Sequence, residues 1–195
     1  YVIGSASTHQ MICDSTLNFS ALSFLAGNIG DPAVRNRGTI GGSIANNDPS
    51  ACYPAAILGT RSQIFTNLRV ISSDNFFKGI FETDLNSNEI ILKVEIEKPL
   101  KSNYQKFVQP ASRFALVGVF VSFYKSEVRV AVTGASENGV FRWFEAENKL
   151  NNDFNYKALS YLSPPKENLI EDIHGNSDYR SELIKILTIR AIKNC

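Results

Sequence analysis

The segment Thr39-Ile40-Gly41-Gly42-Ser43 is the part of the sequence whose residue types and spacing are best suited to hold a ligand. Two adjacent glycines allow positive φ angles and let a ligand come within hydrogen-bonding distance of bare backbone amides. Successive amides in a turn form a concave anion site, and a diphosphate is its natural occupant. The segment matches neither the dinucleotide pattern GxGxxG nor the P-loop pattern GxxxxGK[ST]. The residues alone therefore leave open an anion-binding loop or a tight turn that merely needs glycine.

The other chemically versatile side chains predict no catalytic or metal site. Cys13, Cys52 and Cys195 are odd in number and far apart, and neither His9 nor His174 has ligand-like neighbours. This pattern is not that of a zinc site or a disulfide framework. We expect free thiols in a reducing compartment and structural histidines.

Composition narrows the class of protein. The 195 residues include 20 Lys+Arg and 19 Asp+Glu, and 44% are hydrophobic. This excludes a disordered chain, and a net charge of +1 gives no basic stripe for nucleic acid. No apolar run approaches the ~20 residues of a membrane span. Residues 1–60 hold seven of the 12 glycines and only five charged residues. Such a surface is covered by a ligand or another domain, or belongs to a loop-rich lobe without a ligand.

The first half of the chain predicts a lobe of short elements. We expect strands at residues 1–6 and 90–96, and a hairpin of residues 63–66 and 69–72. Thr8 is suited to cap a helix, and the apolar spacing of residues 20–26 and 51–58 predicts two more helices.

The second half predicts an antiparallel sheet with helices behind it. Residues 114–124 are apolar on both faces, as in a central strand covered on both sides. Further strands are expected at residues 127–133 and 139–143, and helices at residues 144–150, 154–162 and 177–193. Ser177 is the expected N-cap of the last helix, with Tyr179, Leu183, Ile186 and Leu187 on its apolar face. The fold class is therefore α+β, with a boundary near the polar residues 97–103.

A resemblance to a known family decides between the two interpretations of the glycine segment. Residues 34–49, VRNRGTIGGSIANNDP, resemble the second FAD-binding segment of the medium subunit of molybdenum hydroxylases, the carbon monoxide dehydrogenase and xanthine dehydrogenase family. Further similar segments follow in the family's order at residues 4–9, 74–83, 88–92, 110–119, 129–135 and 172–180. The resemblance implies that residues 1–98 are the second lobe of a PCMH-type FAD-binding domain. It implies that residues 103–195 are the family's C-terminal domain.

The resemblance also implies the site residues. Thr39, Ile40, Gly41, Gly42 and Ser43 correspond to the segment that holds the FAD diphosphate and ribityl chain. Asp48 lies in the same polar run, and Ile91 matches a position where an aliphatic side chain packs near the flavin ring. The sequence departs from many relatives at Cys52, where they carry Asp, and from some at Leu116, where they carry Lys.

The function that the resemblance implies is electron transfer. Substrate is oxidised at molybdopterin in a large subunit, and iron–sulfur clusters in a small subunit pass the electrons to FAD here and then to an external acceptor. We expect a hetero-oligomer in the cytoplasm, or one held peripherally at the inner membrane through the complex. Two alternatives stay open: a stand-alone flavin oxidase, and a flavin-free docking module.

The chain opens at Tyr1, within an expected strand, so we expect residues upstream of it. In the family, an N-terminal lobe with another glycine-rich loop grips the other side of the diphosphate. Residues 1–195 are therefore expected to hold about half of an FAD site and to be inactive alone.

Overall fold

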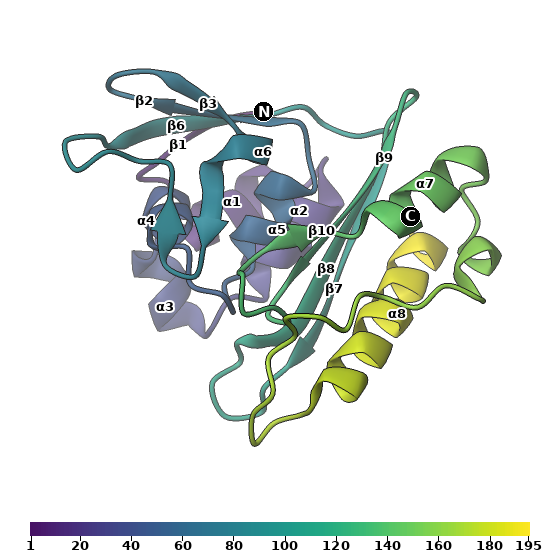
Figure 1. Cartoon of the computed structure of the whole chain (residues 1–195). Coiled ribbons are helices and arrows are strands. Elements are labelled where there is room, and N and C mark those ends of the chain that lie inside the picture. The colour runs from purple at the N-terminus through teal and green to yellow at the C-terminus, as the bar shows by residue number, and fades with distance from the viewer.

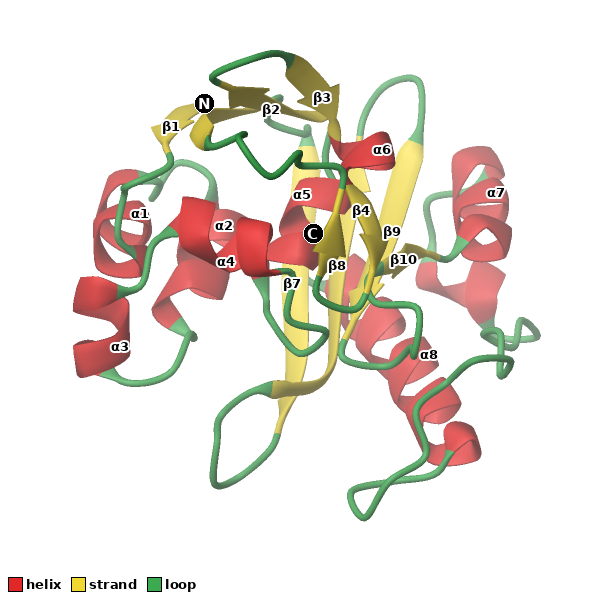
Figure 2. Cartoon of the chain, turned by 60° about the vertical axis from the view of Figure 1, so that its left-hand side comes forward, coloured by secondary structure: helices red, strands yellow, loops and turns green.

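A computed structural model describes all 195 residues, which form an α+β fold around two antiparallel four-stranded sheets (Figures 1 and 2). The first sheet has the strand order β1-β6-β2-β3, the second the order β10-β9-β8-β7, and β4 and β5 make a small ribbon. The strands are β1 Val2–Gly4, β2 Ser62–Thr66, β3 Val70–Ser72, β4 Phe77–Gly79, β5 Glu82–Thr83, β6 Ile91–Ile96, β7 Lys101–Val108, β8 Ala115–Phe123, β9 Val128–Thr133 and β10 Phe141–Arg142.

Most helices are short and lie in the first half of the chain, whereas the longest one is at the end. They are α1 His9–Ser15, α2 Ser20–Gly27, α3 Pro32–Arg37, α4 Ile40–Asn46, α5 Tyr53–Leu58, α6 Ser73–Phe76, α7 Phe144–Asn152 and α8 Ser177–Lys193, with a 3₁₀ turn at Tyr156–Leu159. None of them is both long enough and apolar enough to span a lipid bilayer.

The second sheet separates the helices into two groups. Helices α1–α5 lie on one side of it, and α7 and α8 lie on the other (Figure 1). Strand β8 is buried at every position from Ala115 to Ser122, which confirms the expected central strand. Its Phe120 packs into the core beside α2 and α5, whereas Val119 and Val121 pack into the core beside α8.

The two halves of the chain share one of the two hydrophobic cores. Tyr104, Phe120, Ala131 and Val140 from the second half are buried in the same cluster as the apolar side of α2, α4 and α5. Burying an apolar side chain stabilises a fold by about 1.5–3 kcal/mol, so the second sheet is a large part of what holds the N-terminal helices in place.

Side-chain caps fix where several short helices begin. The Thr8 hydroxyl accepts a hydrogen bond from the amide of Met11 at 3.2 Å, and the Asp31 carboxylate accepts one from Val34 at 2.9 Å. Each cap satisfies one amide that the first helical turn would leave unpaired. The expectation for Thr8 is thus confirmed.

Two expectations for the second half were wrong. Asn176, and not Ser177, caps α8, because its side-chain oxygen accepts from Tyr179 N at 2.9 Å. The expected helix at residues 154–162 is reduced to the 3₁₀ turn, since Leu159 is fully buried whereas Tyr161 is fully exposed. Strand β7 begins at Lys101, within the polar residues 97–103.

The face that α8 buries also differs from the expected one. Leu183 and Leu187 are buried, but Tyr179 and Ile186 remain 42% and 40% exposed. The buried stripe runs instead through Ile184 and Ala191, because the helix packs flat on β7 and β8.

Candidate functional site

The segment Thr39–Ser43 is the N-cap and first turn of helix α4, not a loop. Thr39 has an extended backbone, and its hydroxyl accepts a hydrogen bond from the amide of Gly42 at 3.2 Å. Thr39 also forms an isolated β-bridge with Thr8, the cap of α1. The N-termini of α1 and α4 therefore lie side by side, and contacts from both helix starts hold the segment Thr39–Ser43 in place.

The expectation of bare backbone amides in this segment was wrong. The amide of Ile40 donates to Ser7 O at 3.1 Å, that of Gly41 to Ser5 O at 2.9 Å, and that of Ser43 to Thr39 O at 3.0 Å. Neither glycine has a positive φ angle. The chain adopts a helix here because the Thr39 cap and the strand-like segment before α1 satisfy the amides that a turn would leave free.

The two glycines of the segment differ in what they permit. A Cβ at Gly41 would lie 2.5 Å from Ser5 Cβ and 2.8 Å from Ser5 O, so packing within the chain requires glycine there. A Cβ at Gly42 would meet only Thr39 Oγ1, at 3.2 Å, and Gly42 is exposed. Neither backbone conformation nor internal packing explains the glycine at position 42, which leaves a surface that a ligand can approach closely.

Helix α4 ends at a residue that sequence reasoning missed. Asn47 has a left-handed backbone with φ of 45°, and its side-chain nitrogen donates to Gly79 O at 2.7 Å and to Glu82 O at 2.9 Å. This side chain ties α4 to the β4–β5 ribbon. Asp48 follows, and its carboxylate accepts from the amide of Ser50 at 2.8 Å, which orients the turn towards α5.

A cavity of about 240 Å³ brings part of the expected site together. Ser43 and Asp48 both line it, and Cys52 lies at its wall. Ile91 is not among its lining residues; that side chain is 8% exposed and packs in the first core, while its neighbours Ile90 and Leu92 are exposed.

The cavity is also lined by residues that were not predicted to lie there. His9, Lys106, Arg113 and Phe114 line it, and they come from α1, β7 and the β7–β8 connection. His9 is 5% exposed, its Nδ1 has no hydrogen-bond partner, and burial lowers the pKa of its imidazole. Lys106 and Arg113 give the cavity two cationic side chains, which suits it to a polar, anionic ligand.

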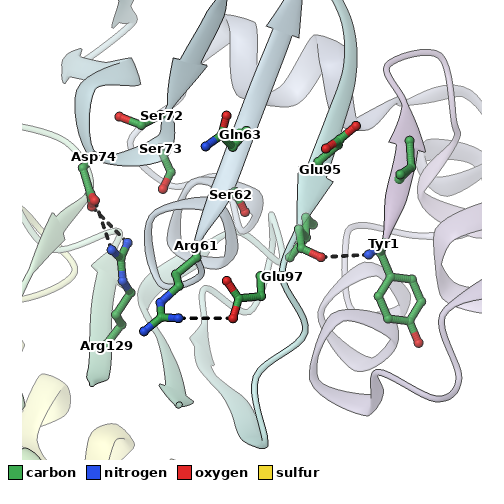
Figure 3. A pocket seen from close by; sticks show the side chains of 12 residues that line it. Tyr1, Arg61, Ser62, Gln63, Ser72, Ser73, Asp74, Glu95, Glu97 and Arg129 are labelled. Carbon is green, nitrogen blue, oxygen red and sulfur yellow. Dashed lines mark hydrogen bonds and ion pairs between the residues drawn. The ribbon is translucent and has the colours of Figure 1, made fainter. Parts of the chain in front are cut away.

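A larger hollow of about 570 Å³ lies elsewhere, between the first sheet and strand β9 (Figure 3). Its charged groups already pair with one another: Arg61 contacts Glu97 at 3.2 Å, and Arg129 contacts Asp74 at 3.0 Å. No buried polar atom without a partner belongs to its lining. This hollow is a joint between the two halves of the chain rather than the expected site.

With this geometry described, comparisons with known proteins give the family. The family described as "FAD binding domain in molybdopterin dehydrogenase" matches residues 1–99. The chain belongs to this family. Its α+β fold and its membership of an FAD-binding family are confirmed, as the resemblance implied, and the relatives are dehydrogenase and oxidoreductase subunits.

Two similar curated proteins are also medium subunits. The chain is 33% identical over 185 residues to the glyceraldehyde dehydrogenase medium chain of Sulfolobus acidocaldarius, covering 85% of this chain and 64% of that one. It is 31% identical to the nicotine 6-hydroxylase medium subunit of Paenarthrobacter nicotinovorans, covering 97% of this chain and 72% of that one. The chain thus spans about two thirds of the length of these relatives, which are medium subunits of multi-subunit enzymes.

Solved structures support the same assignment. Quinoline 2-oxidoreductase from Pseudomonas putida 86 matches with a TM-score of 0.84 and 25% identity, over 99% of this chain and 73% of that one. Carbon monoxide dehydrogenase from Hydrogenophaga pseudoflava matches with a TM-score of 0.81 and 26% identity, over 98% and 73%.

Proposed function

We propose that this chain is the greater part of the FAD-carrying medium subunit of a molybdenum hydroxylase. In this proposal residues 1–98 form the second lobe of the FAD-binding domain, and residues 103–195 form the C-terminal domain. The observation that carries it is Gly42, whose missing side chain leaves open the outer surface of the first turn of α4.

The residues present fit an FAD molecule. Gly42 gives a close approach beside the hydroxyls of Thr39 and Ser43, and the cavity lined by Ser43 and Asp48 adds the cationic side chains of Lys106 and Arg113. In this assignment Thr39, Ile40, Gly41, Gly42 and Ser43 hold the diphosphate and the ribityl chain. Asp48 contacts the same part of the cofactor, and Ile91 packs from the core towards the ring.

The protein's own residues bind and orient the cofactor in this proposal. FAD, when bound, supplies the redox chemistry, because its ring can take up two electrons in single steps and release them to an acceptor. Thr39 and Gly41 fix the start of α4 against the segment before α1, so the surface at Gly42 is already formed before the cofactor arrives. No side chain of the chain is required as an acid or a base.

The partners and location that we propose are those implied by the family resemblance, and the relatives' names, medium chain and medium subunit, support the existence of partner subunits. We propose that a large subunit with molybdopterin and a small subunit with iron–sulfur clusters complete the enzyme, and that it works in the cytoplasm or peripherally at the inner membrane. The three free thiols, Cys13, Cys52 and Cys195, agree with a reducing compartment.

The test uses the full-length protein with its partner subunits. We expect the purified complex to be yellow, with one FAD per medium chain, and its flavin to be reduced when the substrate of the large subunit is added. Residues 1–195 alone should bind FAD much more weakly. A full-length complex that is active without flavin would favour a docking module, and flavin reduction by substrate without the partners would favour a stand-alone oxidase.

A further inference from the structure

The side chain of Lys106 is held in the wall of the cavity without a carboxylate. Its ammonium nitrogen donates to Asn28 O at 2.7 Å and to Arg113 O at 3.0 Å, and it contacts the sulfur of Cys52 at 3.5 Å. A thiol is only a weak hydrogen-bond acceptor. None of the ion pairs in the structure involves Lys106, so its charge is fixed in place and uncompensated.

The rest of the cavity does not neutralise this charge. Arg113 also lines it, with its guanidinium directed to Gly30 O at 3.3 Å, and Asp48 is the one carboxylate of the lining. Two cationic side chains, Lys106 and Arg113, thus face one carboxylate, and Asp48 forms an ion pair with neither of them. Lys106 is half-buried, and apolar side chains of Ile29, Val34 and Phe114 complete the wall, so a charge in the cavity is screened less than in water.

We propose that the Cys52–Lys106 pair sets the reduction potential of the flavin. The inference rests on the proposed function, in which Ser43 and Asp48 hold the ribityl chain, and it takes the attached flavin ring, rather than the diphosphate, to enter the cavity beside them. Uptake of two electrons and one proton by the flavin ring adds one negative charge to it, with the electrons coming from the iron–sulfur clusters of the small subunit. The uncompensated ammonium of Lys106 favours the ring that carries this charge, and the thiol of Cys52 leaves the ammonium free to do so.

The first test changes the charge at Cys52 in the full-length protein within its complex. Cys52→Asp puts a carboxylate beside the Lys106 ammonium, whereas Cys52→Asn is a matched control of the same size without charge. We expect Cys52→Asp to lower the ratio of reduced to oxidised flavin at a fixed potential at least tenfold, about 30 mV for a two-electron couple. Cys52→Asn should change the ratio less than threefold.

The second test changes Lys106 itself. Lys106→Gln keeps a donor for the two carbonyls but removes the charge, and should lower the same ratio at least tenfold. Lys106→Arg keeps the charge and should restore a ratio near that of the wild type. The midpoint potential of bound flavin is measured by spectroelectrochemical titration, and circular dichroism verifies that each variant is folded.

The outcomes separate this inference from the proposed function. Wild-type complex without bound FAD would overturn the proposed function. Flavin bound at an unchanged potential in both Cys52→Asp and Lys106→Gln would overturn the inference alone. A loss of FAD affinity in Lys106→Gln at an unchanged potential would also overturn it, since the ammonium would then face the diphosphate.

Discussion

Arg129 and Asp74 form a two-pronged ion pair across the junction of the two sheets. The distances are 3.0 Å from Nη1 to Oδ1 and 3.1 Å from Nη2 to Oδ2 (Figure 3). Arg129 comes from β9 and Asp74 from α6, so the pair joins the half of the chain that carries α4 to the half that carries β7. The same guanidinium also donates to Thr60 O at 3.2 Å and to Glu127 at 3.0 Å.

Replacing Arg129 should therefore weaken the junction. The side chain is only 9% exposed, and Arg129→Met would remove both of its hydrogen bonds to Asp74, one donor to Thr60 O and one donor to Glu127. Ser73, Arg142 and Arg61 still donate to these three acceptors. Because charge-assisted hydrogen bonds are lost but no acceptor residue is left without a donor, we expect the free energy of unfolding to fall by about 1.5–3 kcal/mol. Urea unfolding followed by circular dichroism measures this free energy.

Lys125→Met, a change on the exposed turn between β8 and β9, is the control and should have little effect. If the free energy of unfolding fell by less than about 1 kcal/mol in Arg129→Met, the Arg129–Asp74 ion pair would not be what stabilises the junction.

Substitutions at the two glycines of α4 should have opposite effects. Gly42→Ala adds a Cβ that meets only Thr39 Oγ1, and alanine is about 1 kcal/mol better than glycine within a helix. The stability of the apoprotein should thus be kept or slightly raised, while FAD affinity of the full-length protein falls at least tenfold. Gly42→Val should abolish FAD binding.

The matched variant Gly41→Ala should instead damage the fold. Its Cβ would clash with the backbone of Ser5, and overpacking of this kind costs about 1–3 kcal/mol. Thermal unfolding of the apoprotein and flavin titration by fluorescence separate the two effects. Unchanged FAD affinity in both Gly42 variants would mean that the first turn of α4 does not face the cofactor.

The fold of the second half could be predicted because its strands carry their signals locally. Val128, Val130 and Val132 alternate at period two, and β8 is apolar except for Ser122, which is the pattern of a strand covered on both faces. The prediction of a helix at residues 154–162 was wrong. It assumed that the apolar residues of the segment share a buried face, but Leu159 is buried whereas Tyr161 is fully exposed. Tertiary burial, which the local pattern does not contain, decided that element.

The candidate site could be predicted only where it is contiguous in sequence. Thr39–Ser43 and Asp48 were found as one segment, but the hydrogen bonds that its amides make to Ser5 and Ser7 depend on how β1 enters α1. Lys106 lies 54 residues from Cys52 in sequence, so only the folded sheet brings the ammonium to the thiol. Contacts between residues this far apart produce no recognisable spacing in the sequence, so sequence analysis could not predict them.

Stability at acidic pH should depend on Glu89. The hydrogen bond from Arg69, at 3.0 Å, is the first cause that lowers the pKa of Glu89 from 4.5 to about 2, followed by those from Asn86 N and the Thr66 hydroxyl. A lowered folded-state pKa gives stability that is present above pH 4.5 and is lost as the pH falls towards about 2. Urea unfolding at a series of pH values should show this loss in the wild type. The slope should be smaller in Glu89→Gln, and an identical slope in that variant would show that Glu89 is not responsible.

Cys52 is the side chain most readily mistaken for a catalytic group, because it is a thiol in the proposed flavin site beside the ammonium of Lys106. Electron transfer through FAD needs no thiol, and Cys52 is 6% exposed and packed into the first core. Cys52→Ser replaces the thiol with a small uncharged group and leaves the ammonium uncompensated. We therefore expect the assembled, full-length enzyme to keep its flavin and most of its turnover with an artificial acceptor.

The test compares the flavin absorbance and the turnover of Cys52→Ser with those of the wild type. A fall in turnover beyond about a hundredfold with flavin still bound is more than ~2.7 kcal/mol of barrier. That result would show that the sulfur itself takes part in the chemistry. The role of Cys52 would then go beyond leaving the Lys106 ammonium without a compensating negative charge.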